Sequence, residues 1–375
     1  MSGKIVLHVI TGLEDGGAES VLYRLCTADV THRHVVVSLM GEGKYGPLLK
    51  EAGIDVYCLN LPSGRIKIGA LFKYIRMIKE IKPDIVQTWM YHADLIGGVC
   101  ARLAGVRNVS WNIRHSELET GKSRKSTIVV ARLCALVSYF VPSKIICCAT
   151  KAKEVHENIG YDRSKMVIVE NGYNLNSLKP DDCLRNNFRV ELGIDDGELL
   201  LGMVGRFNIQ KNHHGLLQSL SFVKASGLHF KCVLIGSGMD DENAELANWI
   251  CQTGLQNEVL LLGQRTDIPA VMNALDIHLL SSSFGEGFPN VLAEAMACGT
   301  PCVTTDVGDA AIIVGNTGWV SPTNDSADFS NKVIQAVNEM RNNPECFEKR
   351  KIGAIERIHH NFSLRAMLDK YHKVW

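Results

Sequence analysis

The feature of this sequence that most constrains its fold is a repeated alternation of short apolar runs with longer helical patterns. Such a run is typical of a buried strand, and strands that alternate with helices build a parallel sheet. The scheme occurs once in each half of the chain, so we predict an α/β protein of two Rossmann-like, doubly wound domains facing a cleft. The predicted strands cover residues 4–10, 35–39, 54–59, 85–87, 109–111 and 145–148 in the first half, and 199–204, 231–235, 259–262, 277–280 and 301–305 in the second.

The boundary between the two domains is expected in residues 179–182 and the polar stretch that follows, where turn formers and charges replace the strand and helix patterns. A length of 375 residues also suits two domains of ordinary size. We assign residues 1–183 to the first domain and residues 184–355 to the second. Near the end of the chain, Ser363 is a suitable N-cap for an amphipathic helix.

Composition and charge exclude several classes of function. Lys plus Arg and Asp plus Glu number 40 each, so no global field attracts nucleic acid, and we expect no nucleic-acid partner. No uninterrupted apolar stretch reaches the ~18 residues that a spanning helix needs. Twelve cysteines without regular spacing, and no signal peptide, favour reduced thiols in a cytoplasmic protein. Cys147-Cys148 and the pair of Cys298 and Cys302 have no His or Cys partners at zinc-ligand spacing nearby, so we assign no metal ligands.

Residues 282–301 place two acidic side chains around the start of one helix. Pro289 suits the first helical turn and Gly299 is a natural stop, so Glu286 lies on the loop and Glu294 about one and a half turns inside the helix. A carboxylate accepts hydrogen bonds from vicinal hydroxyls, and a helix amino end offers N–H groups to diphosphate oxygens. The spacing alone also fits an ordinary amphipathic helix after an acidic loop.

The whole segment closely resembles the signature of the retaining glycosyltransferases of family four, with its glutamates, its Gly-Phe-Pro loop and its small-residue helix intact. The resemblance implies that Glu294 binds the ribose, and Glu286 the sugar, of a nucleotide-diphosphate sugar. It also implies that the residues between the two glutamates bind the donor: Gly287, Phe288, Pro289, Asn290 and Val291.

Two further loops fit the same ligand. Arg206 and Lys211 follow the first strand of the second half and match the family's G-R-x-x-x-x-K pattern, and a guanidinium and an ammonium suit a diphosphate. Gly16 and Gly17 follow the first strand of the chain, where glycines allow a close approach of backbone to phosphate. Without the resemblance, these loops also fit a solvated basic loop and a plain conformational turn.

A metal-independent reaction is expected. No Asp-x-Asp motif, which holds a divalent metal in nucleotide-sugar transferases of the other common fold, occurs in the sequence. Arg206 and Lys211 would replace the metal by neutralising the charge on the leaving nucleotide. We therefore expect no cofactor and no metal in the reaction.

Residues 263–269 match the family's segment near the nucleotide base, which makes Arg265 a candidate donor contact through its backbone. We interpret Asp267 as the N-cap of the helix that Pro269 enters. In the first half, His92 and His115 each follow a buried strand and compete for the reaction centre. Many relatives carry a histidine nearer Trp89, and His92 is the candidate substitute.

The resemblance implies a retaining transferase of the GT-B fold that moves a sugar from a nucleotide-diphosphate sugar to a hydroxyl of a glycan or lipid-linked glycan. The second domain would bind the donor, the first the acceptor, and residues 356–375 would form a helix that crosses back to the first domain. The residues do not separate uridine from guanosine donors, and we favour a UDP-sugar. An epimerase or hydrolase, and a non-catalytic sugar-nucleotide sensor, remain open; a dehydrogenase is disfavoured because the G-x-G-x-x-G fingerprint is missing.

Peripheral contact with a membrane is a further hypothesis, which would place the protein on the inner face. Five basic residues alternate with apolar ones in a pattern that can lie on an anionic bilayer, and a solvated helix face explains the same pattern. These basic residues are Arg65, Lys67, Lys73, Arg76 and Lys79, with Lys122, Arg124 and Lys125 ahead of the apolar residues 128–141.

Overall fold

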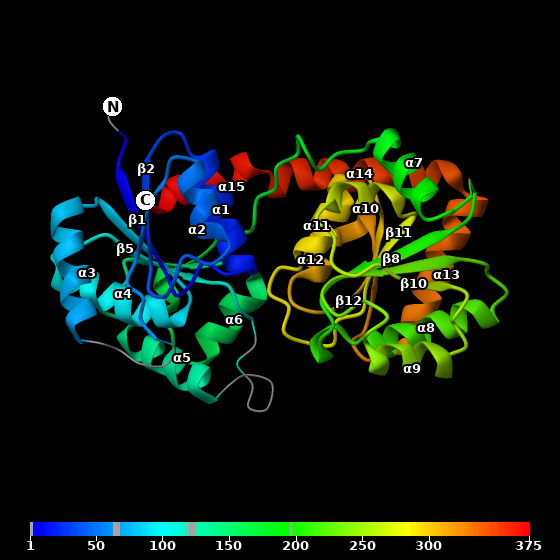
Figure 1. The fold of residues 1–375 in the computed structure, drawn as a ribbon, viewed down its shortest axis with the longest axis horizontal. Coiled ribbons are helices and arrows are strands. Elements are labelled where there is room, and N and C mark those ends of the chain that lie inside the picture. Colours follow the sequence, from blue (N-terminus) through cyan, green and yellow to red (C-terminus); the bar gives the residue numbers. More distant parts are fainter. Residues whose placement is uncertain (1–2, 63–67, 117, 119–124, 196) are drawn as a thin grey trace. The chain divides into compact units, whose positions relative to one another are not determined.

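The computed structural model describes residues 3–62, 68–116, 118, 125–195 and 197–375. The chain divides into two compact units (Figure 1). Unit 1 comprises Met1–Gly172 and Leu364–Trp375, and unit 2 comprises Tyr173–Ser363. The units divide at residues 172 and 363, whereas the sequence analysis placed the boundaries at 183 and 355.

Unit 1 contains a parallel sheet of seven strands in the order β3-β2-β1-β4-β5-β6-β7. The chain reverses its direction of winding between β1 and β4, which are neighbours in the sheet. This is the topology of a doubly wound sheet, in which ligands bind outside the carboxyl ends of the strands at the reversal. The strands are β1 (Ile5–Ile10), β2 (Arg33–Ser38), β3 (Asp55–Cys58), β4 (Ile85–Trp89), β5 (Val109–Ile113), β6 (Lys144–Cys147) and β7 (Met166–Ile168).

Unit 2 repeats the topology with six parallel strands in the order β10-β9-β8-β11-β12-β13. Its reversal lies between β8 and β11. The strands are β8 (Leu200–Val204), β9 (Lys231–Ile235), β10 (Val259–Leu261), β11 (Ile277–Leu280), β12 (Cys302–Thr305) and β13 (Trp319–Ser321). Every predicted strand is present, which confirms the α/β, doubly wound fold class; the edge strands β7 and β13 were not predicted.

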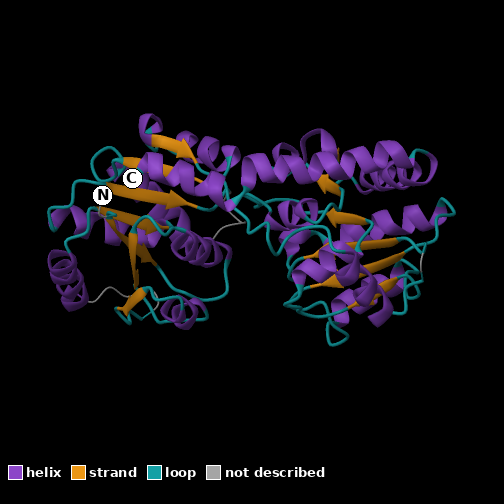
Figure 2. Ribbon diagram, turned by 90° about the horizontal axis from the view of Figure 1, so that it is seen from above, coloured by secondary structure: helices purple, strands orange, loops and turns teal. Residues whose placement is uncertain are grey.

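Helices cover both sides of the strands in each unit (Figure 2). Unit 1 has α1 (Gly17–Ala28), α2 (Tyr45–Glu51), α3 (Ile68–Ile81), α4 (Tyr91–Leu103), α5 (Lys125–Val137), α6 (Thr150–Asn158), the short η1 (Arg163–Lys165) and α15 (Leu364–Val374). Unit 2 has α7 (Asp182–Glu191), η2 (Ile209–Lys211), α8 (His213–Ala225), α9 (Ala244–Gln252), α10 (Ile268–Ala274), α11 (Asn290–Ala297), α12 (Ala310–Val314), η3 (Gly315–Thr317), α13 (Ser326–Asn342) and α14 (Pro344–Phe362).

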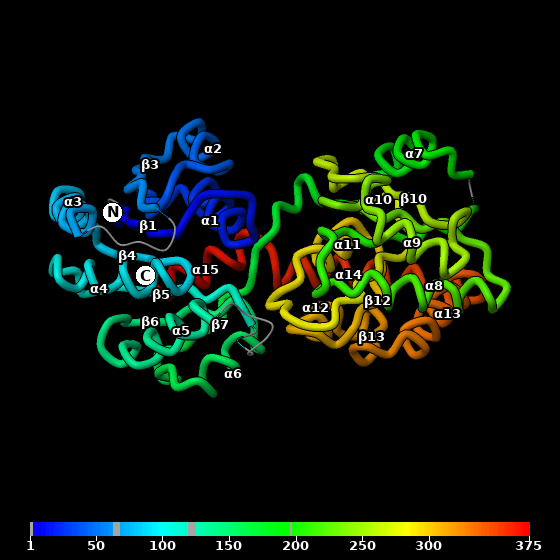
Figure 3. Tube along the Cα trace, turned by 60° about the horizontal axis from the view of Figure 1, so that its bottom comes forward, coloured from blue at the N-terminus to red at the C-terminus, as the bar shows by residue number. Residues whose placement is uncertain are grey.

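The helix α15 is far from the rest of unit 1 in sequence but packs into its core. Met367, Tyr371 and Trp375 belong to the same buried cluster as residues of β1, β2, β4 and α1. The Tyr371 hydroxyl accepts a hydrogen bond from Nδ2 of Asn112 at 2.7 Å. In Figure 3 the red end of the chain lies among the blue and cyan elements of unit 1.

All twelve cysteines lie in the described part of the chain and are free thiols. Among the described helices, none is long and apolar enough to cross a membrane.

Candidate functional site

Two loops meet at the reversal in the sheet of unit 2. One follows β8 and ends with η2, and the other follows β11 and leads into α11. The backbone N–H of Ser283 donates to the carbonyl of Gln210 at 2.8 Å, and the Ser281 hydroxyl donates to the carbonyl of Lys211 at 2.9 Å. The loops are therefore held together at the edge of the sheet where a doubly wound fold binds its ligand.

An ion pair joins the predicted residues of these two loops. The Lys211 ammonium lies 2.7 Å from Oε1 of Glu286, which also accepts a hydrogen bond from the Ser282 hydroxyl at 2.7 Å. The side chains are only 14% and 10% exposed. Because a buried carboxylate is costly without a partner, Lys211 and Ser282 together stabilise the charge of Glu286 at this position.

Glycines let the neighbouring backbone approach these loops closely. Gly308 has φ +57°, and a Cβ there would lie 2.3 Å from the carbonyl oxygen of Glu286. Gly236 has φ +146°, and a Cβ there would lie 2.3 Å from the carbonyl oxygen of Gly205. Since a side chain fits neither the backbone angle nor the space, both positions require glycine.

The helix α11 begins at Asn290, immediately after the loop that carries Glu286. Pro289 occupies the N-cap position, and Glu294 lies half-buried at the fifth helical position. Gly299, at φ +80°, allows the chain to turn away after the helix, as predicted. The predicted helix and its stop are confirmed, and the amino end of the helix, where anions bind to helices, directly follows the loop of Glu286.

The other predicted residues of this loop differ in exposure. The side chains of Phe288 and Pro289 are buried, and Phe288 packs against Phe362 with ring centroids 5.2 Å apart. Gly287 and Val291 are half-buried. Phe288 therefore fixes the entry of α11 by packing, and its side chain does not line an open site.

Arg206 lies in the loop after β8, next to Gly205, and its side chain is exposed. Within the described ranges, no hydrogen bond or ion pair of its guanidinium is seen. Next to the neutralised pair of Lys211 and Glu286, this loop therefore carries one positive charge that is available to an anionic ligand. A guanidinium binds phosphate oxygens through two parallel hydrogen bonds.

Arg265 is engaged within unit 2. Its guanidinium lies 2.7 Å from carboxylate oxygens of both Glu191 and Asp267 and above the ring of Phe188. Hydrogen bonds from Arg265 hold the pKa of Asp267 below its usual range. Asp267 is the N-cap residue of α10, as interpreted from the sequence, but its carboxylate binds Arg265 and makes no cap hydrogen bond.

In unit 1, Gly16 and Gly17 lie at the end of the loop that follows β1, where Gly16 is the N-cap residue of α1. A Cβ on Gly16 would lie 2.3 Å from Oε2 of Glu19. Burial, together with the charges of Asp15 and Glu14, raises the pKa of Glu19. The two glycines thus stand at a strand's carboxyl end and a helix start, as the sequence indicated.

The two candidate histidines follow adjacent strands of the unit 1 sheet. His92 is the second residue of α4, after β4, and its side chain is exposed. His115 lies two residues after β5 and is half-buried. The structure therefore places both histidines at the carboxyl ends of neighbouring strands.

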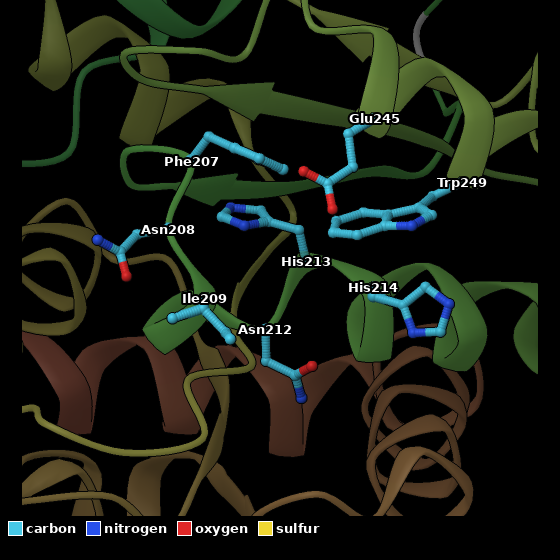
Figure 4. A pocket seen from close by; sticks show the side chains of 8 residues that line it. All are labelled: Phe207, Asn208, Ile209, Asn212, His213, His214, Glu245 and Trp249. Carbon is cyan, nitrogen blue, oxygen red and sulfur yellow. The ribbon is translucent and has the colours of Figure 1, made fainter. Parts of the chain in front are cut away.

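A cavity of about 570 Å³ opens beside the loop of Arg206 and Lys211 in unit 2. In Figure 4 the carboxylate of Glu245 points toward the rings of Phe207 and Trp249. The lining consists of Phe207, Asn208, Ile209, Asn212, His213, His214, Glu245 and Trp249. None of the predicted donor residues lines this cavity, so it is separate from the group formed by Lys211, Glu286 and α11.

Sequence reasoning missed several residues that shape these loops. Ser282 supports Glu286, Gly308 leaves room for the Glu286 backbone, and Met90, between β4 and α4, has φ +71°. A positive φ is uncommon for methionine and is often found where surrounding structure holds a functional loop. The serine run before Glu286 was a visible signal, but nothing in the sequence marks Gly308 or Met90.

Comparison with known proteins assigns both halves of the chain. Residues 15–177 match the family Glycosyltransferase Family 4, and residues 185–351 match Glycosyl transferases group 1. Similar proteins include the UDP-Gal:alpha-D-GlcNAc-diphosphoundecaprenol alpha-1,3-galactosyltransferase of Escherichia coli, which is 27% identical over 72% of this chain and 70% of that protein. The capsular polysaccharide biosynthesis glycosyltransferase CapM of Staphylococcus aureus is 25% identical over 72% of each chain.

The fold also has solved counterparts. The structure of Anabaena HepE in complex with UDP and glucose superposes with a TM-score of 0.85, at 21% identity, over 99% of this chain and 98% of the other. The chain is therefore a glycosyltransferase of the GT-B fold and belongs with the family 4 enzymes. The resemblance seen in the sequence is confirmed at the level of family, fold and transferase class.

Proposed function

We propose that this enzyme transfers a sugar, with retention of anomeric configuration and without a metal, from a UDP-sugar to a hydroxyl of a glycan or lipid-linked glycan. The observation that carries the proposal is the ion pair of Lys211 and Glu286 beside the exposed Arg206, at the reversal of the unit 2 sheet. Cations, a carboxylate and a helix amino end are the groups that a diphosphate sugar requires.

Each group has a distinct role in binding the donor. Arg206 and the N–H groups at the start of α11 bind the diphosphate oxygens. Lys211 has three N–H donors, so it is able to keep its bond to Glu286 while it donates to a phosphate oxygen. Glu286 accepts hydrogen bonds from hydroxyls of the transferred sugar, and Glu294 accepts those of the ribose.

The reaction breaks the bond between the anomeric carbon and the phosphate oxygen and forms a bond from that carbon to the acceptor oxygen. Negative charge grows on the diphosphate as the first bond lengthens, and Arg206 and Lys211 stabilise this charge more strongly in the transition state than in the ground state. The departing phosphate oxygen takes the proton of the acceptor hydroxyl. No strong protein base is then needed.

Support for the donor comes from relatives. The galactosyltransferase of Escherichia coli uses UDP-Gal by name, and HepE is solved with UDP and glucose. These names favour a uridine donor over a guanosine donor. The acceptor of the Escherichia coli enzyme is a sugar on a diphosphate lipid, which supports a lipid-linked glycan in cell-surface glycan synthesis as the acceptor here.

Unit 1 would bind this acceptor, with His92 or His115 near the transferred sugar. It also carries exposed apolar side chains on two helices, among them Phe72 on α3 and Leu136 on α5, at 68% and 69% exposure. Lys73, Arg76 and Lys79 of the predicted basic pattern are exposed on α3. Arg65, Lys67, Lys122 and Arg124 lie outside the described residues. We propose that this surface lies on an anionic membrane at its inner face.

The test is a transfer assay with UDP- and GDP-sugars, a lipid-linked glycan acceptor and excess EDTA. The proposal expects transfer from a UDP-sugar that persists in EDTA, with the donor's anomeric configuration kept in the product by NMR. Donor consumption without an acceptor would instead identify a hydrolase or epimerase, and binding without turnover a sensor. Sedimentation with anionic vesicles at low salt tests the membrane surface separately.

A further inference from the structure

Three histidines converge on one oxygen of a buried aspartate in unit 1. Asp29 follows α1 directly and is 6% exposed. Its Oδ2 lies 2.9 Å from Nδ1 of His32, 3.2 Å from Nε2 of His34 and 3.0 Å from Nε2 of His372. His32 precedes β2, His34 lies in β2 and His372 lies in α15, so the cluster joins the C-terminal helix to the start of β2.

One of the three histidines is oriented by a chain of hydrogen bonds from the core. The indole N–H of Trp89 donates to Nδ1 of His8 at 3.2 Å, so the proton of neutral His8 is on Nε2. His8 Nε2 lies 2.9 Å from Nδ1 of His34, which leaves Nε2 of His34 to donate to Asp29. Burial and the neighbouring His34 lower the pKa of His8 well below its usual value, which agrees with a neutral ring.

Oδ2 of Asp29 does not have enough lone-pair sites to accept hydrogen bonds from both of the remaining histidines. An ionised carboxylate has about four lone-pair sites on its two oxygens, or about two on each. Oδ1 of Asp29 already accepts the backbone N–H of Thr31 at 2.8 Å, while three histidine nitrogens approach Oδ2. After the bond from His34, only one site on Oδ2 remains for His32 and His372.

A cation bound between Asp29, His32 and His372 removes this excess of hydrogen-bond donors at Oδ2, because each side chain then contacts the ion. The ligand atoms of Asp29, His32 and His372 all lie within 4.8 Å of one another. Zinc bonds to histidine nitrogen and carboxylate oxygen measure ~2.0–2.2 Å, so the ligands of a tetrahedral ion stand about 3.3–3.6 Å apart. The observed separations of 2.9 Å and 3.0 Å from Asp29 need only a small expansion to admit the ion.

We propose that Asp29, His32 and His372 form a zinc-type metal site that fastens the helix α15 to unit 1. The side chain of His372 is 30% exposed, so the ion has access from solvent and water can take the fourth position. The hydrogen bond from Nε2 of His34 orients the Asp29 carboxylate, as residues that contact a metal ligand commonly do at metal sites.

The ion has no part in the sugar transfer. The site lies where α1 leads into β2, at the amino ends of the strands, whereas the loops that carry Gly16, His92 and His115 follow the carboxyl ends. It also adds a metal site where the sequence analysis assigned no ligands, because His372 stands far from Asp29 and His32 in the chain.

A second group, formed by His8, Cys26 and His34, is a weaker candidate for the same ion. Burial, with Asp29 nearby, raises the pKa of the Cys26 thiol well above its usual value, and zinc binds the thiolate. Both histidines also use ring nitrogens in the hydrogen-bond chain described above. The Asp29 site is therefore the one we assign.

The experiment is a titration of the full-length, metal-stripped protein with ZnCl₂ by calorimetry, with CoCl₂ as a spectroscopic probe. We expect one zinc per chain, visible cobalt bands of tetrahedral type that zinc abolishes, and a higher Tm with zinc because the ion binds only the folded state. In His32→Ala and His372→Ala this binding is lost, and in His372→Asp, which restores a ligand, it returns.

Two control variants assign the site. His229→Ala removes an exposed histidine of unit 2, and Cys26→Ala removes the alternative ligand; both should keep one zinc per chain. Circular dichroism of each variant without metal shows that it is folded. The proposal is overturned if the unaltered protein binds no zinc, or if His32→Ala and His372→Ala still bind one.

Discussion

The Lys211 ammonium lies 2.7 Å from the Glu286 carboxylate, and the two residues come from loops after neighbouring strands of the unit 2 sheet. The pair thus links two loops of unit 2 that lie far apart in the sequence. Its loss should affect both the stability of unit 2 and the binding of an anionic donor, and these two effects can be measured separately.

Lys211→Met should reduce sugar transfer at least about a hundredfold, because a preorganised positive charge at the leaving diphosphate is lost. It should also lower the free energy of unfolding by about 1–3 kcal/mol, since the nearly buried Glu286 carboxylate loses its partner. Transfer kinetics and denaturant unfolding check the two effects.

The pair of Lys224 and Glu258, 2.9 Å apart in the same unit, provides a matched control. Lys224 is 42% exposed, so Lys224→Met should cost less than about 1 kcal/mol and leave transfer unchanged. The double variant Lys211→Met with Glu286→Gln should recover stability but not activity. Recovery of activity in that variant would contradict the proposed role of the lysine.

Arg206→Ala should weaken the binding of UDP about ten- to hundredfold, the equivalent of one lost charged hydrogen-bond pair. Because the side chain is exposed, the free energy of unfolding should change by no more than about 0.5 kcal/mol. Calorimetric titration with UDP and thermal unfolding test this. Arg341→Ala, at another exposed arginine of unit 2, should change neither quantity. Equal UDP affinity in the two variants would remove Arg206 from the site.

Gly308→Ala should displace the Glu286 loop, because the added Cβ would lie 2.3 Å from the Glu286 carbonyl oxygen. Gly254 is a suitable control: its φ of +68° resembles the +57° of Gly308, but a Cβ there meets nothing within 4 Å. Gly254→Ala should cost about 1–2 kcal/mol of stability for the backbone angle and keep activity. Gly308→Ala should be less stable still and lose at least most of its transfer activity.

The stability of unit 1 should fall as pH rises from 5 to 8 because of Asp94. Burial raises the pKa of Asp94 to about 7, although the Thr88 hydroxyl and the Asn112 backbone oppose the shift. Between its unfolded pKa near 4 and its folded pKa, the Asp94 carboxyl group is ionised in the unfolded chain but still protonated in the folded protein. Each rise of one pH unit in this range therefore lowers the free energy of unfolding.

Asp94→Asn removes this titration. The difference in free energy of unfolding between the variant and the unaltered protein should therefore shift in favour of the variant by about 3 kcal/mol from pH 5 to pH 8. Urea unfolding of both proteins at several pH values measures the difference. Parallel curves across this range would show that Asp94 ionises in the folded protein as it does in the unfolded chain.

Most of the fold could be predicted from the sequence because its strands are buried on both faces and read as continuous apolar runs. The two strands that were missed, β7 and β13, have three residues each and lie at sheet edges. A run of three residues carries too little periodicity to distinguish a strand from a loop. Their pairing with β6 and β12 defines them, and that pairing is a tertiary property.

The candidate site could be predicted only in part. Glu286, Lys211 and Arg206 lie in the loops that follow two neighbouring strands, where the sheet topology brings them to one edge, so their positions follow from local patterns. The role of Ser282 and the binding of Asp267 to Arg265 depend on side-chain geometry. The cluster around Asp29 was not predicted, because His372 stands far from Asp29, His32 and His34 in the sequence and joins them only through the packing of α15.

The packing of α15 into unit 1 has a consequence for how the protein is made. Residues 364–375 leave the ribosome after residues 173–363, yet Met367, Tyr371 and Trp375 complete the core of unit 1. During synthesis, part of the core of unit 1 therefore stays uncovered while unit 2 emerges and folds. A nascent chain in this state exposes apolar surface of the kind that chaperones bind.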